Sequence, residues 1–238
     1  MAACDSQPLS EDQLVWHALD CRKTGFFVDV GAHDAQIGSQ TYFLEEQGWE
    51  GILIEPQSAL CEKLRSARPH SRVFQVACGA PGQPEQARIH IAEASSHSSL
   101  IKNLIDPSER YVESEAVKLM TLDDVLAEAG NPRVDFVSID VEGTQLDVLL
   151  GFNLQHHRPA LMLIEDHLHN LKVHRYLMWQ GYRLVKRTGL NNWYVPKDRS
   201  FTLTSPLERL RLWKKVWLNT PFRKLRVWLR RKRHRPEQ

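Results

Sequence analysis

The chain has 238 residues, of which 42% are apolar and 25% charged, and its formal net charge is +2 at pH 7. This length suits one α/β domain with an appendage and is too short for two domains of ordinary size. The composition excludes a disordered chain, and no run approaches the roughly 18–20 apolar residues of a transmembrane helix. The first residues show no basic region followed by an apolar run, so a cytoplasmic protein is expected.

Charge is divided unevenly along the chain. Residues 196–238 hold 14 Lys and Arg against three acidic residues, a net of +11, so the total of +2 leaves −9 for residues 1–195. We therefore expect two parts, a domain over residues 1–195 and a basic tail over residues 196–238.

Short apolar runs alternate with helical patterns between Phe26 and Val195, as is typical of βα units around a mainly parallel sheet. Seven strands are predicted, at residues 26–30, 51–55, 72–78, 134–140, 160–165, 182–187 and 192–195. Helices are expected at residues 36–47, 57–67, 122–129, 145–150 and 168–180. The predicted fold is therefore α/β, a doubly wound and mainly parallel seven-stranded sheet of the Rossmann-like kind.

The interval between residues 79 and 120 fits no single element. Two extended stretches, residues 86–92 and 116–120, flank a polar loop with four serines between Ser95 and Ser99. A loop of that length is more often a lid over a site than filler.

The loop after the first strand reads Val28-Asp-Val-Gly-Ala-His-Asp-Ala-Gln-Ile-Gly38. Gly31 permits a tight turn and a close approach of a ligand to the backbone. Asp29 ends the first strand and Glu55 the second, and either acid alone is also explained as a solvated strand end. Asp29 would repel a dinucleotide pyrophosphate but favours the positive sulfur and ammonium of S-adenosylmethionine, whose ribose hydroxyls Glu55 can bind. The charges therefore favour S-adenosylmethionine over NAD.

Acidic residues also end the fourth and fifth predicted strands. Asp140 and Glu142 follow the fourth strand, and Glu165 and His167 follow the fifth. The carboxyl ends of parallel strands open into the same crevice as the cofactor loop, so these groups are expected to converge near the methyl donor. The four residues are the candidate catalytic residues.

S-adenosylmethionine is a methyl donor, and transfer to a hydroxyl acceptor would need an aligned acceptor and the removal of its proton. A clustered carboxylate with a raised pKa, or His167, can act as the general base. The same carboxylates can instead hold Mg²⁺, which would lower the pKa of a coordinated hydroxyl. Asp140 also has a structural interpretation as a helix N-cap, because Gly143-Thr144 begins the next helix. Four other histidines are expected at the surface: His156, His157, His169 and His174.

Five stretches stand out: Phe27-Val-Asp-Val-Gly-Ala-His-Asp34, Gly48-Trp-Glu-Gly-Ile-Leu-Ile-Glu-Pro56, Ser98-Ser-Leu100, Leu119-Met-Thr-Leu-Asp-Asp124 and Val134-Asp-Phe-Val-Ser-Ile-Asp-Val-Glu-Gly143. In this order they resemble the FkbM-type methyltransferases over most of the chain except the tail. The resemblance implies S-adenosylmethionine as the cofactor and, most often, O-methylation of a sugar or natural-product hydroxyl. Many relatives have glycine where this chain has Ala35.

Carried over position by position, the resemblance also implies a set of cofactor contacts. The methionine end would be lined by Asp29, Gly31, Ala32 and Asp34. Glu55 would hold the ribose, and the segment around Ala77 and Cys78 would flank the adenine. Asp140 is expected to contact the cofactor as well as to serve catalysis.

In the tail, Ser205-Pro206 and Thr220-Pro221 each combine an N-cap residue with proline at the first helical position, so two short helices are predicted. Each would carry an apolar face with tryptophan beside arginine and lysine. We expect residues 205–235 to bind an anionic membrane surface, placing the protein peripherally at the inner face of a membrane. Packing on the acidic body of the protein and binding of nucleic-acid phosphates are the alternatives.

The leading functional prediction is an S-adenosylmethionine-dependent O-methyltransferase for a hydroxyl of a glycan, a lipid-linked glycan or a related small molecule. The chain lacks an Asn/Asp-Pro-Pro-aromatic segment after the fourth strand, which argues against base N-methylation. An RNA ribose methyltransferase and a catalytically inactive binding protein docked through its tail are the alternatives. The acceptor has no readable sequence pattern.

Overall fold

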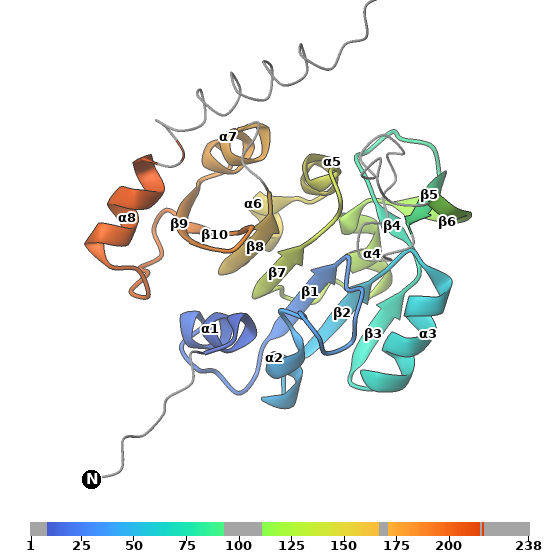
Figure 1. Ribbon diagram of the computed structural model, residues 1–238, viewed down its shortest axis with the longest axis horizontal. Coiled ribbons are helices and arrows are strands. Elements are labelled where there is room, and N and C mark those ends of the chain that lie inside the picture. Colours follow the sequence, from blue (N-terminus) through green and yellow to red (C-terminus); the bar gives the residue numbers. More distant parts are fainter. Residues whose placement is uncertain (1–8, 93–110, 167–170, 215, 217–238) are drawn as a thin grey trace, which may run out of the picture.

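A seven-stranded sheet of order β3-β2-β1-β7-β8-β10-β9 forms the centre of the protein in the computed structural model, which describes residues 9–92, 111–166, 171–214 and 216 (Figure 1). The first five strands in this order are parallel to their neighbours, and β10 runs antiparallel to β8 and β9. The predicted doubly wound α/β fold is confirmed. The strands are β1 (Phe26–Val30), β2 (Glu50–Ile54), β3 (Ser71–Phe74), β7 (Phe136–Ile139), β8 (Leu161–Glu165), β9 (Tyr182–Thr188) and β10 (Asn191–Pro196).

The direction of winding reverses between β1 and β7. The chain moves outward from β1 to β2 and β3, then returns to the other side of β1 to form β7 and β8. In such sheets the loops at the carboxyl ends of the two central strands diverge and leave a crevice for a ligand. This reversal point is where the candidate site lies.

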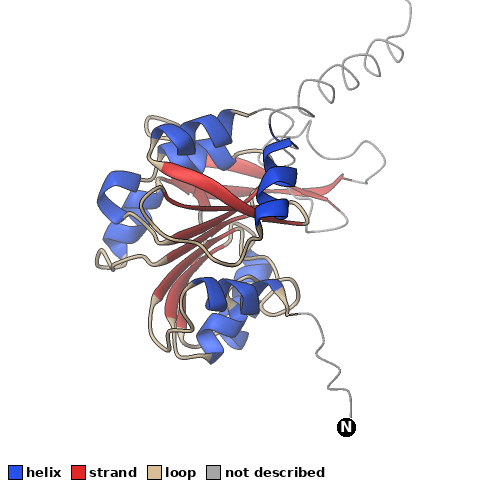
Figure 2. Cartoon of the chain, turned by 90° about the vertical axis from the view of Figure 1, so that its left-hand side faces the viewer, coloured by secondary structure: helices blue, strands red, loops and turns tan. Residues whose placement is uncertain are grey.

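Helices cover both faces of the sheet, as Figure 2 shows. One face packs against α1 (Glu11–Ala18), α2 (Tyr42–Glu46) and α3 (Ser58–Ala67), and the other against α4 (Leu122–Glu128), α5 (Gln145–Leu150) and α7 (Lys172–Trp179). Side chains of a strand alternate between the faces. Phe27 therefore joins the first apolar cluster, whereas Val28 and Val30 join the second. Apolar side chains on both faces explain the near-continuous apolar runs in the sequence.

The helix predicted over residues 36–47 is shorter in the structure, which has only α2 there. The carboxylate of Asp34 accepts hydrogen bonds from the backbone N–H groups of Gln36 and Ile37, at 2.9 and 2.7 Å. The Ser39 hydroxyl likewise accepts from the N–H of Tyr42, at 3.1 Å. Short polar side chains thus bind the backbone groups that a helix would use, and the segment forms turns instead.

The strand predicted over residues 72–78 is broken. Its second part is β4 (Ala77–Cys78), which leaves the main sheet and pairs with β6 (Tyr111–Met120). β5 (Gln86–Ala92) pairs antiparallel with β6 and completes a three-stranded sheet. The extended stretches predicted at 86–92 and 116–120 are confirmed, while the serine loop at 95–99 lies outside the described residues. Helices α1 and α6 (Leu154–His157) were not predicted.

Helix α8 (Pro206–Trp213) begins as predicted and packs beside β9 (Figure 1). The Ser205 hydroxyl accepts from the backbone N–H of Glu208 at 3.2 Å, with Pro206 in the first turn. The second predicted tail helix, after Thr220, lies outside the described residues. Among the residues that are described, no helix is long and apolar enough to cross a membrane.

Candidate functional site

The loop after β1 crosses the end of β7 in direct contact. Gly31 adopts a positive φ of 85°, and its N–H donates to the carbonyl of Ile54 at 2.9 Å. A Cβ at this position would lie 1.9 Å from the carbonyl oxygen of Asp140. Both the backbone conformation and the missing Cβ therefore require glycine. This close approach brings the loop against the carboxyl end of β7.

Asp34 fixes the shape of the same loop. Its two accepted backbone hydrogen bonds hold the pKa of the carboxyl below its ordinary value, so Asp34 stays ionised at neutral pH. Its carboxylate therefore contributes negative charge to the space beside the loop.

A cavity of about 290 Å³ lies between this loop and the ends of β7 and β8. Of the residues predicted to bind the cofactor, four line this cavity: Gly31, Ala32, Asp34 and Asp140. Of the predicted catalytic residues, three line it: Asp140, Glu142 and Glu165. His33, Ile37, Gly38, Ser39 and Gln40 complete the wall without having been predicted there.

Three carboxylates meet at the strand ends. One oxygen from each of Asp140, Glu142 and Glu165 lies within 4.8 Å of the others. Burial, followed by the hydrogen bond and the negative charge of Glu165, raises the pKa of Asp140 far above its ordinary value. The cluster therefore holds a proton at neutral pH instead of three full charges. An all-oxygen set of this kind also suits Mg²⁺.

The structure corrects one interpretation and leaves one residue undescribed. Helix α5 has Thr144 at its N-cap, so the interpretation of Asp140 as the N-cap residue is wrong. His167, the fourth predicted catalytic residue, lies outside the described part of the chain.

Glu55 follows β2 and lies beneath the loop, only 3% exposed. Its two carboxylate oxygens accept from the backbone N–H groups of His33 and Gln57, at 3.1 and 2.9 Å. Burial raises the pKa of Glu55 to about 7. Glu55, predicted to hold the ribose, thus connects the β1 loop to the start of α3. It is not among the residues that line the cavity between the β1 loop and the ends of β7 and β8, here called the acidic cavity.

Asp29 lies behind the acidic cavity and does not line it. It is 2% exposed, and the Thr41 hydroxyl donates to its carboxylate at 2.7 Å. Burial raises its pKa, although the Thr41 hydrogen bond and the charge of Arg68 oppose the shift. Asp29, predicted at the methionine end of the cofactor, thus supports the loop from within.

Arg68 connects this support to the rest of the domain and was not singled out from the sequence. Its guanidinium donates to the Thr41 hydroxyl at 3.2 Å and to the carbonyl of Ala35 at 3.1 Å, and it forms a buried ion pair with Glu45. It also lies over the ring of Tyr42, 5.5 Å from the centroid. In the sequence Arg68 is only an arginine before a proline at the end of a helix, and nothing in that pattern indicates that its side chain is buried or which residues it contacts.

Ala77 and Cys78 form β4, beyond the end of β3. Both are buried, Ala77 against Ile89 and Val117, and Cys78 in the main apolar cluster beside α4. Burial raises the pKa of the Cys78 thiol, which keeps it neutral. The predicted adenine neighbours are thus uncharged and fixed in position.

The expectation of surface histidines is wrong for His174. It is 4% exposed, with Nδ1 3.3 Å from the Tyr194 hydroxyl, and burial lowers its pKa. His156 is exposed as expected. The expectation is also wrong for the side chain of His157, which is 6% exposed, stacks on Phe152 and pairs with Asp123 of α4. His169 lies outside the described residues.

Comparison with known proteins gives the family. Residues 29–184 match the Methyltransferase FkbM domain family. No curated protein matches the chain significantly. Among solved structures, it is similar to a methyltransferase FkbM from Methylobacillus flagellatus KT, with 15% identity and a TM-score of 0.50 over 73% of this chain and 44% of that one. The chain thus spans less than half the length of that protein, and the likeness shows the fold alone.

Two other solved structures share weaker similarity. An uncharacterised protein from Listeria monocytogenes serotype 4b is 11% identical, with a TM-score of 0.46 over 97% of this chain and 90% of that one. TrmK of M. capricolum, solved with S-adenosyl-homocysteine, is 9% identical, with a TM-score of 0.36 over 78% of this chain and 67% of that one.

Proposed function

Because the chain belongs to the FkbM family of methyltransferases, we propose that it transfers a methyl group from S-adenosylmethionine to a hydroxyl of a glycan, a lipid-linked glycan or a related small molecule. The observation that carries the proposal is the acidic cavity at the winding reversal of the sheet, where the β1 loop meets three carboxylates. A cavity at that point is the expected ligand site of a doubly wound sheet.

The residues present fit this cofactor. The sulfonium and ammonium groups of S-adenosylmethionine are positive, and the cavity beside the loop is lined by Asp34, Glu142 and Glu165. Gly31 and Ala32 let the ligand lie close to the backbone. Glu55 stands at the end of the neighbouring strand, where it would hold the ribose, and the buried Ala77 and Cys78 would flank the adenine. When bound, the cofactor supplies an electrophilic methyl group.

The carboxylate cluster would accept the proton of the acceptor hydroxyl. Asp140 holds a proton in the free protein because burial and Glu165 raise its pKa. Asp140 loses that proton more readily when a positive charge enters the cavity, and its carboxylate then becomes a base. We propose this role for the cluster in preference to Mg²⁺ binding, and His167 remains a further candidate for the base.

The test uses an acceptor screen followed by matched variants. Radiolabelled S-adenosylmethionine is incubated with the full chain and with glycans, lipid-linked glycans and RNA, and methylated products are identified. Asp140→Asn, Glu142→Gln and Glu165→Gln are then compared with Asp147→Asn, a control in α5 outside the cavity. At least one cavity variant should lose turnover while retaining cofactor binding, because the proton leaves only on the way to the transition state.

Three outcomes would change the proposal. Methylation of RNA alone would favour the ribose methyltransferase, and binding without any methylated product would favour the inactive binding protein. Loss of activity in EDTA, restored by Mg²⁺, would assign the carboxylates to a metal ion instead of a base.

A further inference from the structure

A second cavity, of about 510 Å³, lies between α7, β9 and α8 and shares no lining residue with the acidic cavity. Its size falls within the roughly 300–1,000 Å³ typical of small-molecule sites. Seven of its twelve lining residues are apolar: Met178, Leu184, Val185, Leu210, Leu212, Trp213 and Val216. Leu210 and Trp213 remain 62% and 54% exposed, so the cavity opens to solvent along α8.

Exposed apolar side chains continue beyond the mouth of the cavity. Leu207, one turn before Leu210 on α8, is 68% exposed, and Trp179, at the end of α7, is 80% exposed. Large apolar side chains exposed on both helices that border the cavity favour a binding site there. The occupant must therefore present an apolar part to α8.

The polar lining is cationic. Arg183, Lys197 and Arg209 line the cavity, and none of its described lining residues carries a carboxylate. Arg183 donates to the carbonyl of Arg199 at 2.8 Å, and Arg209 to that of Phe201 at 3.0 Å. These acceptors are neutral carbonyls, and within the part of the chain that the structure describes neither guanidinium pairs with a carboxylate.

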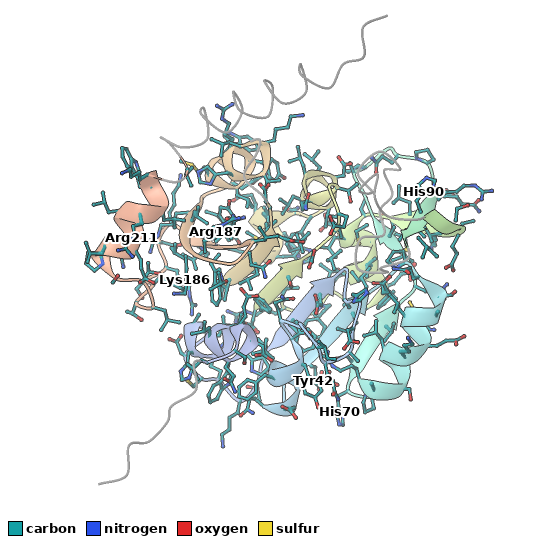
Figure 3. The ribbon with its side chains drawn as sticks, viewed as in Figure 1. Tyr42, His70, His90, Lys186, Arg187 and Arg211 are labelled. Carbon is teal, nitrogen blue, oxygen red and sulfur yellow. The ribbon has the colours of Figure 1, made fainter. Side chains whose placement is uncertain are left out.

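Lys197 adds a third charge at the same cavity. Its ammonium group contacts no carboxylate among the described residues, and the neighbouring Asp198 is paired with Arg158 at 2.6 Å. Lys186 and Arg211 lie on the same side of the molecule, beside α8 (Figure 3), where Lys186 pairs with Glu208 at 3.7 Å. The lining of the cavity is therefore positive as well as apolar.

The apolar wall and the basic residues of the cavity restrict which ligand can bind there. Residues 217–238 of this chain hold eight Lys and Arg against one acid, so the cations of the cavity would repel them. Nucleic-acid phosphates satisfy the cations but not the apolar wall. We propose that this cavity binds an anionic amphiphile with one acyl chain, the headgroup at Lys197, Arg183 and Arg209 and the chain along Leu210 and Trp213. The site is independent of the methyl-transfer site.

The test measures binding to the full chain by calorimetry with three soluble probes. They are myristoyl lysophosphatidylglycerol below its micellar concentration, myristoyl lysophosphatidylcholine and glycerol phosphate. The first should bind about tenfold more tightly than the second, since only its headgroup carries a net negative charge for the basic residues. Glycerol phosphate, which has the charge but no chain, should not bind.

Matched variants locate the site. Leu210→Glu, inside the cavity, and Lys197→Glu, at its charged end, should each weaken binding of the anionic amphiphile by about tenfold or more. Leu150→Glu, an exposed leucine at the end of α5, and Lys23→Glu, an exposed lysine elsewhere, do not line the cavity and should change binding less than about twofold. Unfolding midpoints should stay close together, because all four positions are on the surface.

Each contrary result overturns the proposal. Equal binding of the two lysolipids would show that the basic residues play no part, and an equal loss of binding in Leu150→Glu and Leu210→Glu would show that the ligand does not bind in this cavity. Absence of binding, or a dimer in sedimentation that dissociates in Leu210→Glu, would show that the face is covered by another part of this chain or by a second copy.

Discussion

Gly31 and Asp140 meet at the winding reversal of the sheet, where a Cβ on Gly31 would lie 1.9 Å from the Asp140 carbonyl oxygen. The contact joins the loop proposed to hold the cofactor to the strand end proposed to hold the base. The N–H of Asp140 in turn donates to the carbonyl of Val30 at 2.9 Å, so the two strand ends are locked in register. A change at this contact alters both halves of the site.

The first prediction compares two glycines of the loop. Gly31→Ala should destabilise the protein by more than about 3 kcal/mol and abolish cofactor binding, because strain at positive φ adds to the collision with β7. Gly38→Ala shares the positive φ, 76°, but would meet no atom within 4 Å, so it should cost only about 1–2 kcal/mol. Urea unfolding and calorimetry measure both effects. Equal losses in the two variants would show that the contact with Asp140 has no role.

The second prediction concerns stability against pH. The pKa of Asp140 in the folded protein is raised from its ordinary 3.8, so the folded state keeps a proton that the unfolded chain releases. That stabilisation is complete below pH about 3.8 and is lost as the pH rises toward the raised pKa. Asn does not titrate, so Asp140→Asn avoids this loss. At neutral pH its free energy of unfolding should exceed that of the wild type by about 0.5–2 kcal/mol. Urea unfolding from pH 4 to 9 tests this, and a pH-independent difference would contradict it.

The third prediction contrasts two arginines. Arg68→Leu leaves Glu45 as a buried charge without its partner, so it should cost about 3–5 kcal/mol and loosen the cofactor loop through Ala35. Arg158→Leu breaks an exposed pair with Asp198, whose side chains are 59% and 69% exposed, and should cost less than about 1 kcal/mol. If the two variants lost similar amounts of unfolding free energy in urea, the proposed importance of the buried Arg68 contacts would be contradicted.

The fourth prediction tests the ribose contact. Glu55→Ala should weaken binding of S-adenosylmethionine by about 1.5–3 kcal/mol, the scale of hydrogen bonds to a charged group. Glu50→Ala, at the exposed beginning of the same strand, should leave binding unchanged. Calorimetry at matched pH gives both values. Unchanged binding in Glu55→Ala would place the ribose elsewhere.

Much of the fold could be predicted from the sequence because the spacing of apolar residues indicates which side chains of a strand or helix are buried. Strand β1 and helix α5 lie where they were predicted, and β2 differs by one residue at each end. The errors have local causes. Asp34 and Ser39 bind backbone N–H groups that the predicted helix would have used, and no periodic pattern reveals such side-chain bonds. Helix α1 has few buried side chains, so its apolar period is weak.

The candidate site could be predicted in part for a similar reason. Residues at strand ends, such as Asp140 and Glu165, are brought together by any parallel sheet, and they do line one cavity. Residues that act through long-range contacts could not be found this way. Thr41 and Arg68 are 27 positions apart and meet only because α2 and α3 pack on the same face of the sheet. Asp29 lies two residues after Phe27 on β1, so its side chain faces the same side of the sheet and meets Thr41 there.

Calorimetric titration of the full chain with S-adenosylhomocysteine, and separately with NAD, tests the central claim most directly. Carboxylates around the loop and a single close glycine favour the ammonium group that S-adenosylhomocysteine shares with S-adenosylmethionine, and they disfavour a pyrophosphate. The account predicts that S-adenosylhomocysteine binds and that Gly31→Ala abolishes its binding, while NAD gives no heat of binding. Binding of NAD at micromolar concentration without binding of S-adenosylhomocysteine would contradict it.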